Sequence, residues 1–343
     1  MNVVFPIMIS FSREERGSTI RDVAKAANVS VATASYALNG SGRISEETRK
    51  HVRQIADELG YSPSITARAL KLGKGNLIAI LTDGFAGPWY GEILEGLQPT
   101  LKDAGFTVFA ITLEKESLQL CMNLTTSGMV RGLIVLNPGE AIKPTIKRLE
   151  GLAPVVIFDS TSDSGGAIQF VIDNRGGIST IMEHLWDKGY RDYLWVDGPA
   201  ETWDAQERKD AFDSFLEKQG TPQTQIAHVH GGFQYATAFK NVTNYLSQGK
   251  IPRAIVAAND ESALGALEAV KTHHLTVPDD VAIAGFDGLD VTAWTSPPLT
   301  TVYYDRKSLG KEMAYALLQA IDERDLTPTT KFIPVKLLVR EST

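Results

Sequence analysis

From residue 76 onward, short apolar runs alternate with stretches of amphipathic helical pattern, and this alternation constrains the fold more than any other feature of the chain. Strands separated by helices imply parallel sheets with helices on both faces. Near-continuous apolar runs also suit strands that are buried on both sides. We therefore expect an α/β module here. Its predicted strands are 77–81, 108–111, 133–136, 155–158, 193–196, 254–257 and 281–284.

Residues 18–62 show a different pattern, of short helices separated by tight turns. Thr19 and Asp22 stand at the spacing of a capping box, which predicts the start of a first helix. Asn28 tolerates the left-handed conformation that a tight turn needs, and Ser30 is a good N-cap for a second helix. Two short helices joined by a four-residue turn are typical of a helix-turn-helix motif.

The second helix carries small residues on its inner side. We expect Ala34, Ala37 and Leu38 to pack inward, which lets two helices cross closely. The residues expected to point away from this core are Val31, Ala32, Ser35 and Tyr36.

A third helix should begin after Ser45, which can cap it, and end at Gly60. Its apolar stripe is formed by Val52, Ile55, Ala56 and Leu59. An ordinary three-helix bundle without a nucleic-acid role remains the alternative for this segment.

The residues that flank this segment have no strong pattern of their own. Residues 63–75 are expected to form a hinge helix and linker, because Pro63 lies near a helix start and Gly73 and Gly75 follow. A helix this short is marginal alone, so it would fold only against a partner or DNA. Residues 1–17 are expected to be a disordered extension or the product of an upstream start codon.

The formal charge of the chain is −7, but it is unevenly distributed. Residues 1–75 contain 11 Lys and Arg against 7 Asp and Glu, whereas the remainder contains 23 against 34. A basic N-terminal segment followed by an acidic remainder indicates that the N-terminal segment binds a polyanion and that the remainder does not.

Several classes of protein are disfavoured by what the sequence lacks. Cys121 is the single cysteine, which rules out an internal disulfide and fits a reducing cytoplasm. No apolar run approaches the roughly 18 residues of a membrane helix, and no secretory signal is recognisable. Glycine-rich nucleotide loops, a nucleophile elbow and metal-spaced His or Cys clusters are absent, so we expect neither enzyme, cofactor nor metal site.

Four short motifs of the N-terminal segment together resemble the LacI family of bacterial transcription regulators, and the match continues to the closing residues 337–342. The motifs are Ile20–Ala24, Val29–Ser35, Leu38–Asn39 and Gly60–Pro63. The resemblance implies an all-α helix-turn-helix headpiece at 18–62. It also implies, at 76–343, an α/β sensor like periplasmic binding proteins, with two interleaved, doubly wound subdomains that bind an effector and mediate dimerisation.

The resemblance also assigns residues to DNA binding. Val31, Ala32 and Tyr36 fall where the family contacts base edges, although none carries a bidentate fork for guanine or adenine. Leu70 matches a residue that wedges into the minor groove. The remaining assignments, to phosphates, sugars or nearby positions, are Thr19, Ser30, Thr33, Ser35, Asn39 and Lys71.

Ligands of open α/β sheets sit beyond the carboxyl ends of the strands, and polar and aromatic side chains gather there. Arg208 and Asp287 could clamp vicinal hydroxyls, and Trp89 and Phe233 could stack on a sugar, so a carbohydrate is favoured over a nucleobase. The candidate residues, some placed by position and some by the resemblance, are Trp89, Tyr90, Asp159, Asp204, Arg208, Phe233, Asn259, Asp287 and Tyr304.

These expectations combine into a cytoplasmic, nucleoid-associated repressor that binds a near-palindromic operator as a homodimer and responds to a mono- or oligosaccharide. The partners are then operator DNA, the effector and a second copy, with no membrane. Two alternatives stay open: a periplasmic-type sugar-binding protein without a DNA role, and a sugar-modifying enzyme on the same fold.

Overall fold

The computed structural model of the chain describes residues 18–39, 42, 44–61, 75–85, 87–159, 166–323 and 328–343. The chain divides into two compact units, with the boundary between Gly75 and Asn76. The predicted extension at 1–17 and nearly all of the predicted hinge at 63–75 lie outside the described residues.

Among its described residues, the first unit contains three helices, α1 (Ile20–Ala26), α2 (Val31–Asn39) and α3 (Glu46–Glu58), as the sequence predicts. Because the α2 residues in their shared core are alanines, the helices pack closely. The buried core residues are Val23, Ala24, Ala27, Ala34, Ala37, Val52 and Ala56.

The helix ends of this unit follow from their capping residues. Asn28 has a φ of 53° in the turn between α1 and α2. The hydroxyl of Ser30 accepts the N–H of Thr33 at 3.0 Å, and Ser45 caps α3 in the same way. Gly60, with a φ of 60°, ends α3. These four predictions are confirmed.

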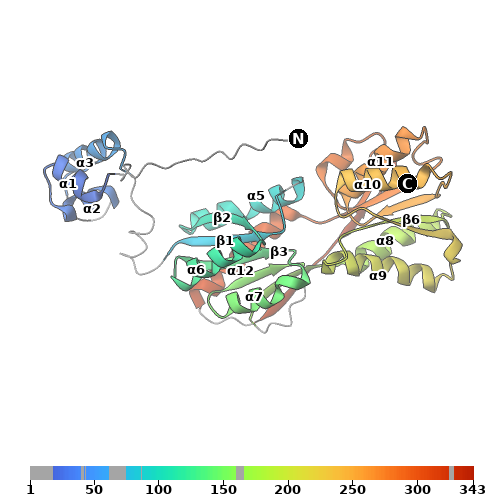
Figure 1. The fold of residues 1–343 in the computed structure, drawn as a ribbon, viewed down its shortest axis with the longest axis horizontal. Helices are drawn as coiled ribbons and strands as arrows, with labels where there is room; N and C mark the ends of the chain where they lie inside the picture. The colour runs from blue at the N-terminus through green and yellow to red at the C-terminus, as the bar shows by residue number, and fades with distance from the viewer. Residues whose placement is uncertain are drawn as a thin grey trace, which may run out of the picture. The chain divides into compact units, whose positions relative to one another are not determined.

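The second unit contains two six-stranded sheets, each in its own subdomain (Figure 1). The first sheet has the order β11-β5-β4-β3-β1-β2, and every pairing in it is parallel. Its strands are β1 (Leu77–Thr82), β2 (Thr107–Thr112), β3 (Val130–Leu136), β4 (Val155–Phe158), β5 (Ile168–Ile172) and β11 (Thr329–Ile333).

Helices cover both faces of the first sheet. On β1, Ile78 and Ile80 pack with α5 (Pro88–Asp103) and α12 (Arg306–Glu323), whereas Ala79 and Leu81 pack on the opposite side. That opposite side is covered by α6 (Lys115–Thr126) and α7 (Lys143–Glu150). The alternation explains the continuous apolar run, since both faces of the strand are buried.

The second sheet repeats this design with the order β12-β10-β9-β8-β6-β7. Only β12 pairs antiparallel, with β10. The strands are β6 (Tyr193–Asp197), β7 (Ile226–His230), β8 (Ala254–Ala257), β9 (Ala282–Asp287), β10 (Thr300–Tyr303) and β12 (Lys336–Leu338).

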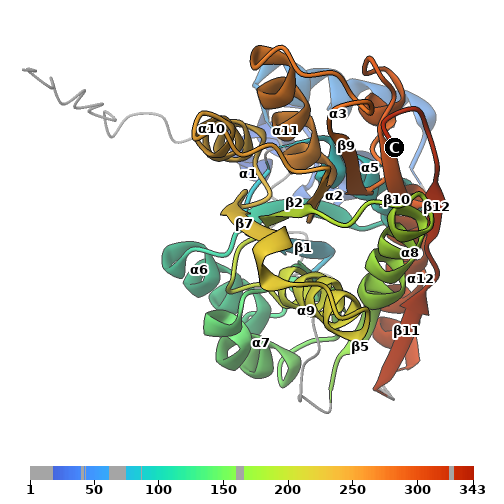
Figure 2. The same ribbon diagram turned by 90° about the vertical axis from the view of Figure 1, so that its right-hand side faces the viewer.

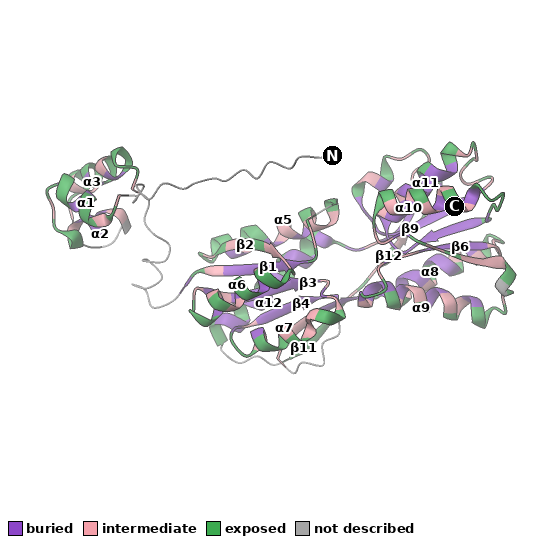
Figure 3. Cartoon of the chain, viewed as in Figure 1, coloured by how far each residue is buried: buried purple, intermediate pink, exposed green. Residues whose placement is uncertain are grey.

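In Figure 2, α10 and α11 lie on one side of the second sheet and α8 and α9 on the other. These helices are α8 (Asn174–Asp187), α9 (Trp203–Lys218), α10 (Tyr235–Leu246) and α11 (Asp260–Thr272). Three short 3-10 helices are Glu140–Ile142, Gln223–Gln225 and Asp290–Ala293. Figure 3 shows that the strands are mostly buried and that the helices expose their outer faces.

The two subdomains are interleaved, as the sequence resemblance implies. The described chain crosses between them at residues 172–174, 303–306 and 333–336. The carboxyl ends of the parallel strands of both sheets therefore face the same gap. Among the described residues, no helix is long and apolar enough to cross a membrane.

All seven predicted strands are present, and the structure adds β5, β7, β10, β11 and β12. Two of the additions have sequences that do not reveal them, because β11 is largely exposed at a sheet edge and β12 has three residues. By contrast, β5 is an apolar run whose last three residues are buried, and the prediction missed it.

Candidate functional site

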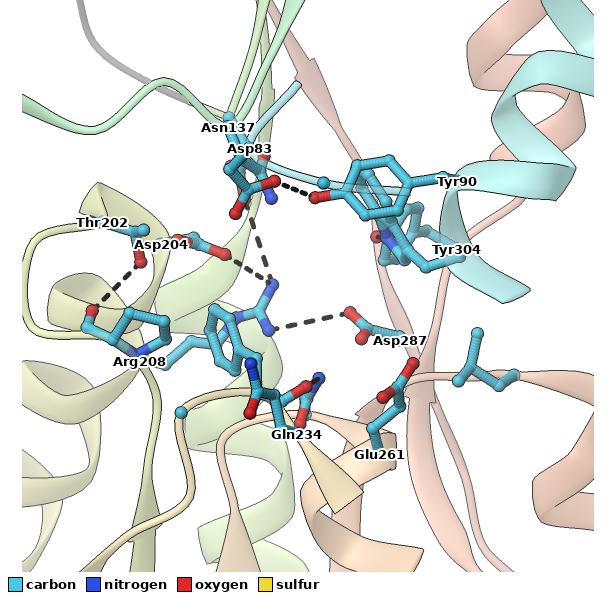
Figure 4. A pocket seen from close by; sticks show the side chains of 18 residues that line it. Asp83, Tyr90, Asn137, Thr202, Asp204, Arg208, Gln234, Glu261, Asp287 and Tyr304 are labelled. Atoms are coloured by element: carbon cyan, nitrogen blue, oxygen red, sulfur yellow. Dashed lines mark hydrogen bonds and ion pairs between the residues drawn. The ribbon is translucent and has the colours of Figure 1, made fainter. Parts of the chain in front are cut away.

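The second unit has a cavity of about 210 Å³ between its two subdomains, shown from close by in Figure 4. All nine residues that the sequence places in a ligand site line this cavity. The other lining residues are Asp83, Gly84, Asn137, Pro199, Thr202, Gly232, Gln234, Glu261 and Leu289.

Arg208 lies at the centre of this cluster and is only 2% exposed. Its Nε donates to Asn174 Oδ1 at 2.7 Å, and its Nη1 donates to the carbonyl of Ala258 at 2.8 Å. These two bonds hold the guanidinium in place. The charge therefore faces the cavity in a fixed orientation.

Three carboxylates surround this guanidinium without bonding to it directly. Asp287 Oδ1 is 3.6 Å from Nη1, and the nearest oxygens of Asp159 and Asp204 are each 3.9 Å from Nη2. These separations are ion-pair distances but are longer than hydrogen bonds. The carboxylates therefore keep acceptor capacity that Arg208 does not use.

Several buried acceptors of the cavity have no donor among the described residues. They are Asn137 Oδ1, Asp159 Oδ2 and Asp204 Oδ1. Buried polar atoms are nearly always hydrogen-bonded in a functional state, because an unpaired one costs about 1–3 kcal/mol. These atoms indicate a ligand that supplies several N–H or O–H donors.

The acidic groups resist ionisation in this environment. Burial, followed by the charge of Asp204, raises the pKa of Asp159 well above its usual value, although Arg208 opposes the shift. Burial likewise raises the pKa of Asp287 to about 6, against the attraction of Arg208. The positive charge of Arg208 thus offsets only part of the effect of burial on the pKa values of these carboxyl groups.

The backbone is strained at the same positions. Asn137, Asp159, Phe233 and Asp287 have φ values of 46°, 51°, 58° and 116°. Non-glycine residues adopt such angles rarely, at a cost on the order of 1–3 kcal/mol each, and they gather at functional sites.

Aromatic rings form one wall of the cavity. Trp89 donates its indole N–H to the hydroxyl of Tyr304 at 2.5 Å, and its ring meets that of Tyr90 edge-on at 4.7 Å. Tyr90 in turn donates its hydroxyl to Asp83. Phe233 faces the Arg208 guanidinium, 5.6 Å from its ring centroid.

Asn259 and Arg306 position the lining residues. The side chain of Asn259 caps α11 and donates to the carbonyl of Phe233 at 3.3 Å. Arg306, buried at the start of α12, donates to the carbonyls of Asp287 and Gly288. Its Nη2 also lies 3.0 Å from Glu92 Oε2, so Arg306 ties α5 to the loop after β9.

The first unit presents a second candidate site on α2. Val31 and Tyr36 are 45% and 44% exposed, and Ala32 is exposed beside them. Ser30 and Thr33 are accessible at the start of the same helix, while Thr19 donates its backbone N–H and hydroxyl to Asp22. One side of α2 therefore carries exposed side chains.

Family comparisons agree with both units. Residues 19–64 match the model described as bacterial regulatory proteins of the lacI family, and residues 182–343 match a periplasmic binding protein-like domain. The chain belongs to the LacI family.

Whole-chain relatives in the LacI family are named as repressors. The chain is 29% identical over 314 residues to the HTH-type transcriptional repressor PurR of Aliivibrio fischeri, covering 90% of this chain and 93% of the relative. It is 26% identical over 333 residues to CytR of Escherichia coli K12, covering 96% and 98%.

Solved structures of LacI-family proteins share the fold. A Lac repressor dimer bound to operator and the anti-inducer ONPF matches with a TM-score of 0.77 and 26% identity, covering 96% of this chain and 99% of that one. A complex of the regulator CelR with cellobiose matches with a TM-score of 0.71 and 26% identity, covering 95% and 100%. The chain is a DNA-binding transcriptional regulator with a small-molecule effector domain.

Within this LacI-family headpiece, one prediction about orientation is wrong. Ser35 is only 7% exposed, because it faces the buried side of α2 together with Ala34. The side chain of Asn39 and the residues Leu70 and Lys71 lie outside what the structure describes.

The sequence missed several lining residues of the sensor. Asn137 directly follows a predicted strand, so the rule that ligands bind at strand ends could have found it. Glu261 and Gln234 lie at the starts of α11 and α10, where helical pattern gives no sign of a cavity.

Proposed function

We propose that this LacI-family regulator is a repressor whose affinity for its operator is set by a polyhydroxyl ligand, a mono- or oligosaccharide, in the cavity around Arg208. The observation that carries the proposal is the set of unpaired acceptors, Asn137 Oδ1, Asp159 Oδ2 and Asp204 Oδ1. Sugar hydroxyls would donate to them and accept from Arg208. Trp89 offers an aromatic surface for the ring.

The charge of the cavity favours a sugar without phosphate. Its lining carries several carboxylates beside the guanidinium of Arg208. An anionic group would meet like charge at short range in a poorly solvated site. The CelR complex with cellobiose is consistent with an unphosphorylated ligand, since it shares the fold. We therefore expect sugar phosphates to bind more weakly than the parent sugars.

On the DNA side, α2 would lie in the major groove with Val31, Ala32 and Tyr36 at base edges. Thr19, Ser30, Thr33 and Asn39 would contact phosphates or sugars. Leu70 would wedge into the minor groove beside Lys71 and read the deformability of the central step.

A homodimer on a near-palindromic operator fits this arrangement, because two-fold protein symmetry matches two half-sites. The Lac repressor that shares the fold is itself a dimer on its operator. Ligand binding between the subdomains would favour one of two states and so change operator affinity. Such a protein would act at the nucleoid, in the cytoplasm.

The test is a thermal-shift screen of the full chain against mono- and disaccharides and their phosphates. Saturating ligand should raise the melting temperature, since a ligand at about 100 times its Kd stabilises by roughly 2.7 kcal/mol. A DNA-binding selection with the full chain should return a symmetric site. The affinity of the protein for this site should fall when a sugar from the screen is added and when the salt concentration is raised. Sequence-indifferent DNA binding would overturn the proposal.

Arg208→Lys provides a variant test. Lysine keeps the charge but loses the planar fork that Asn174 and Ala258 hold. We expect sugar binding to weaken about tenfold or more, with operator binding retained. Arg148→Lys, on the exposed side of α7, is the matched control and should change neither. Equal sugar affinity in both variants would show that Arg208 does not bind the sugar.

A further inference from the structure

The cavity is strongly acidic. Within the part of the chain that the structure describes, its lining contains one guanidinium, that of Arg208, and neither lysine nor histidine. Buried charge of one sign is costly unless an opposite charge compensates it. The carboxylates of the lining are Asp83, Asp159, Asp204, Glu261 and Asp287.

Two of these carboxylates face each other from different subdomains. Asp159 follows β4 in the first subdomain, and Asp204 lies in the first turn of α9 in the second. Each residue is 2% exposed. One oxygen of each, Asp159 Oδ2 and Asp204 Oδ1, has no donor among the described residues.

Arg208 compensates this pair incompletely. Its Nε and Nη1 already donate to Asn174 and to the carbonyl of Ala258. Its Nη2 is 3.9 Å from both carboxylates, and its Nη1 is 3.6 Å from Asp287. Figure 4 shows Arg208 with Asp204 and Asp287. One guanidinium therefore faces three carboxyls, and Arg306 attracts Asp287 as well. The ionised form of Asp159 is compensated only in part, in agreement with its raised pKa.

Different groups of a ligand could pair with Asp159 Oδ2 and Asp204 Oδ1, with different consequences. A hydroxyl would satisfy the hydrogen bonds but leave the net charge. Among the described residues, no three His, Cys, Asp or Glu side chains are arranged to hold a metal ion. An ammonium group supplies three donors and a positive charge at once. It would therefore satisfy the two oxygens and also compensate the charge of the carboxylates.

We infer that the ligand is an amino sugar whose ammonium group lies between Asp159 and Asp204, while Arg208 holds neighbouring hydroxyls. The inference rests on the proposed function, because a sugar must bind in the cavity for its amino group to be recognised. The sugar ring would contact the aromatic surface of Trp89, as in the proposed function. The carboxylates at the rim, Asp83 and Glu261, favour the entry of a cation.

The experiment compares matched pairs of sugars by titration calorimetry on the full chain. The pairs are glucosamine with glucose, galactosamine with galactose, and the glucosamine disaccharide with cellobiose. At about pH 6.5 a sugar amine is protonated, since its pKa is close to that of an α-amino group. The amino member of the pair that binds should do so on the order of tenfold more tightly. Its N-acetyl derivative, which has no charge, should lose that gain.

Two variants localise the effect. Asp159→Asn and Asp204→Asn keep the shape of the side chain but remove one charge. We expect each to reduce the preference for the amino sugar, which is the ratio of its affinity to that of the neutral sugar measured on the same variant, to about threefold or less. Glu217→Gln, on the exposed side of α9, removes a charge from the same helix as Asp204 and should keep the full preference.

The failure of the inference differs from the failure of the proposed function. If neutral sugars bind and their amino counterparts bind equally or more weakly, the ammonium site is wrong while the sugar effector stands. If a preference for amino sugars persists in both Asn variants, the ammonium group is recognised at another position and the assignment to Asp159 and Asp204 is wrong. If no saccharide of the screen binds, the proposed function itself is overturned.

Discussion

Asp260 is completely buried at the start of α11, next in sequence to two residues that line the cavity. Its Oδ1 accepts the hydroxyl of Thr301 at 2.6 Å, and its Oδ2 accepts the N–H of Leu289 at 2.7 Å. Burial, followed by the charge of Asp287, raises its pKa to about 8 from an ordinary 3.8. The folded protein therefore keeps a proton here that the unfolded chain releases.

This proton makes stability depend on pH. Between the unfolded pKa near 3.8 and the folded pKa of about 8, the folded state binds more protons, so stability falls as pH rises through that window. We expect Asp260→Asn to flatten the decline in melting temperature between about pH 5 and pH 8, because an amide can donate to Thr301 and accept from Leu289 without ionising. The melting temperature of both proteins is measured across that range.

Asp279→Asn, on the exposed turn before β9, serves as the matched control and should preserve the slope of the parent protein. If Asp260→Asn shows the same slope as the parent, the proton is not held at Asp260. Sequence could not indicate this role, because Asn259-Asp260-Glu261 reads as an ordinary helix start. The burial that shifts the pKa comes from β9, β10 and the loop after β9, which are distant in sequence.

At the scale of helices and strands, α5 and α12 cross with their backbones in contact. A Cβ atom on Gly96 would lie 2.0 Å from the carbonyl oxygen of Lys307, and one on Gly310 would lie 2.2 Å from that of Ile93. Only glycine allows this approach. The crossing matters for the site, because α5 begins beside Trp89 and α12 begins at Arg306.

Gly96→Ala should destabilise the sensor by about 1–3 kcal/mol, the usual cost of overpacking a close contact. Gly91→Ala on the same helix is the control. A Cβ there meets nothing within 4 Å, so alanine should be neutral or stabilise by up to about 1 kcal/mol through helix propensity. Chemical denaturation measures both. Equal effects of the two substitutions would show that the helices can separate freely.

The same elements show what sequence pattern can and cannot predict. Six of the seven predicted strands are buried on both faces and so read as continuous apolar runs. The seventh, β2, is only partly buried but also has an apolar run. Strand β11, whose Phe332 is 74% exposed, has no such run. The sequence also cannot distinguish Gly96 from Gly91, because the difference lies in a helix more than 200 residues away. The cavity residues were predictable because parallel strands bring their carboxyl ends together.

At the scale of the whole molecule, the two units have separate cores. The buried clusters of the sensor begin at Ile78, and that of the headpiece lies between Val23 and Ala56. The boundary between the units falls at Gly75 and Asn76. A fragment of residues 76–343 retains every described residue of the cavity and none of the described DNA-facing helix.

We therefore expect the fragment 76–343 to bind the sugar ligand with an affinity within about threefold of the full chain and to lose operator binding entirely. Titration calorimetry and fluorescence anisotropy with labelled operator measure the two activities. The complementary full-chain variant is Tyr36→Ala, which removes an exposed side chain of α2 without touching the core. It should weaken operator binding by about 1–3 kcal/mol per altered base contact and leave sugar affinity unchanged. Tight operator binding by the fragment would place DNA recognition in the sensor. A loss of sugar binding in the fragment would mean instead that the headpiece or the residues before 76 contribute to the sugar site. Sugar binding and DNA binding would then not belong to separate units.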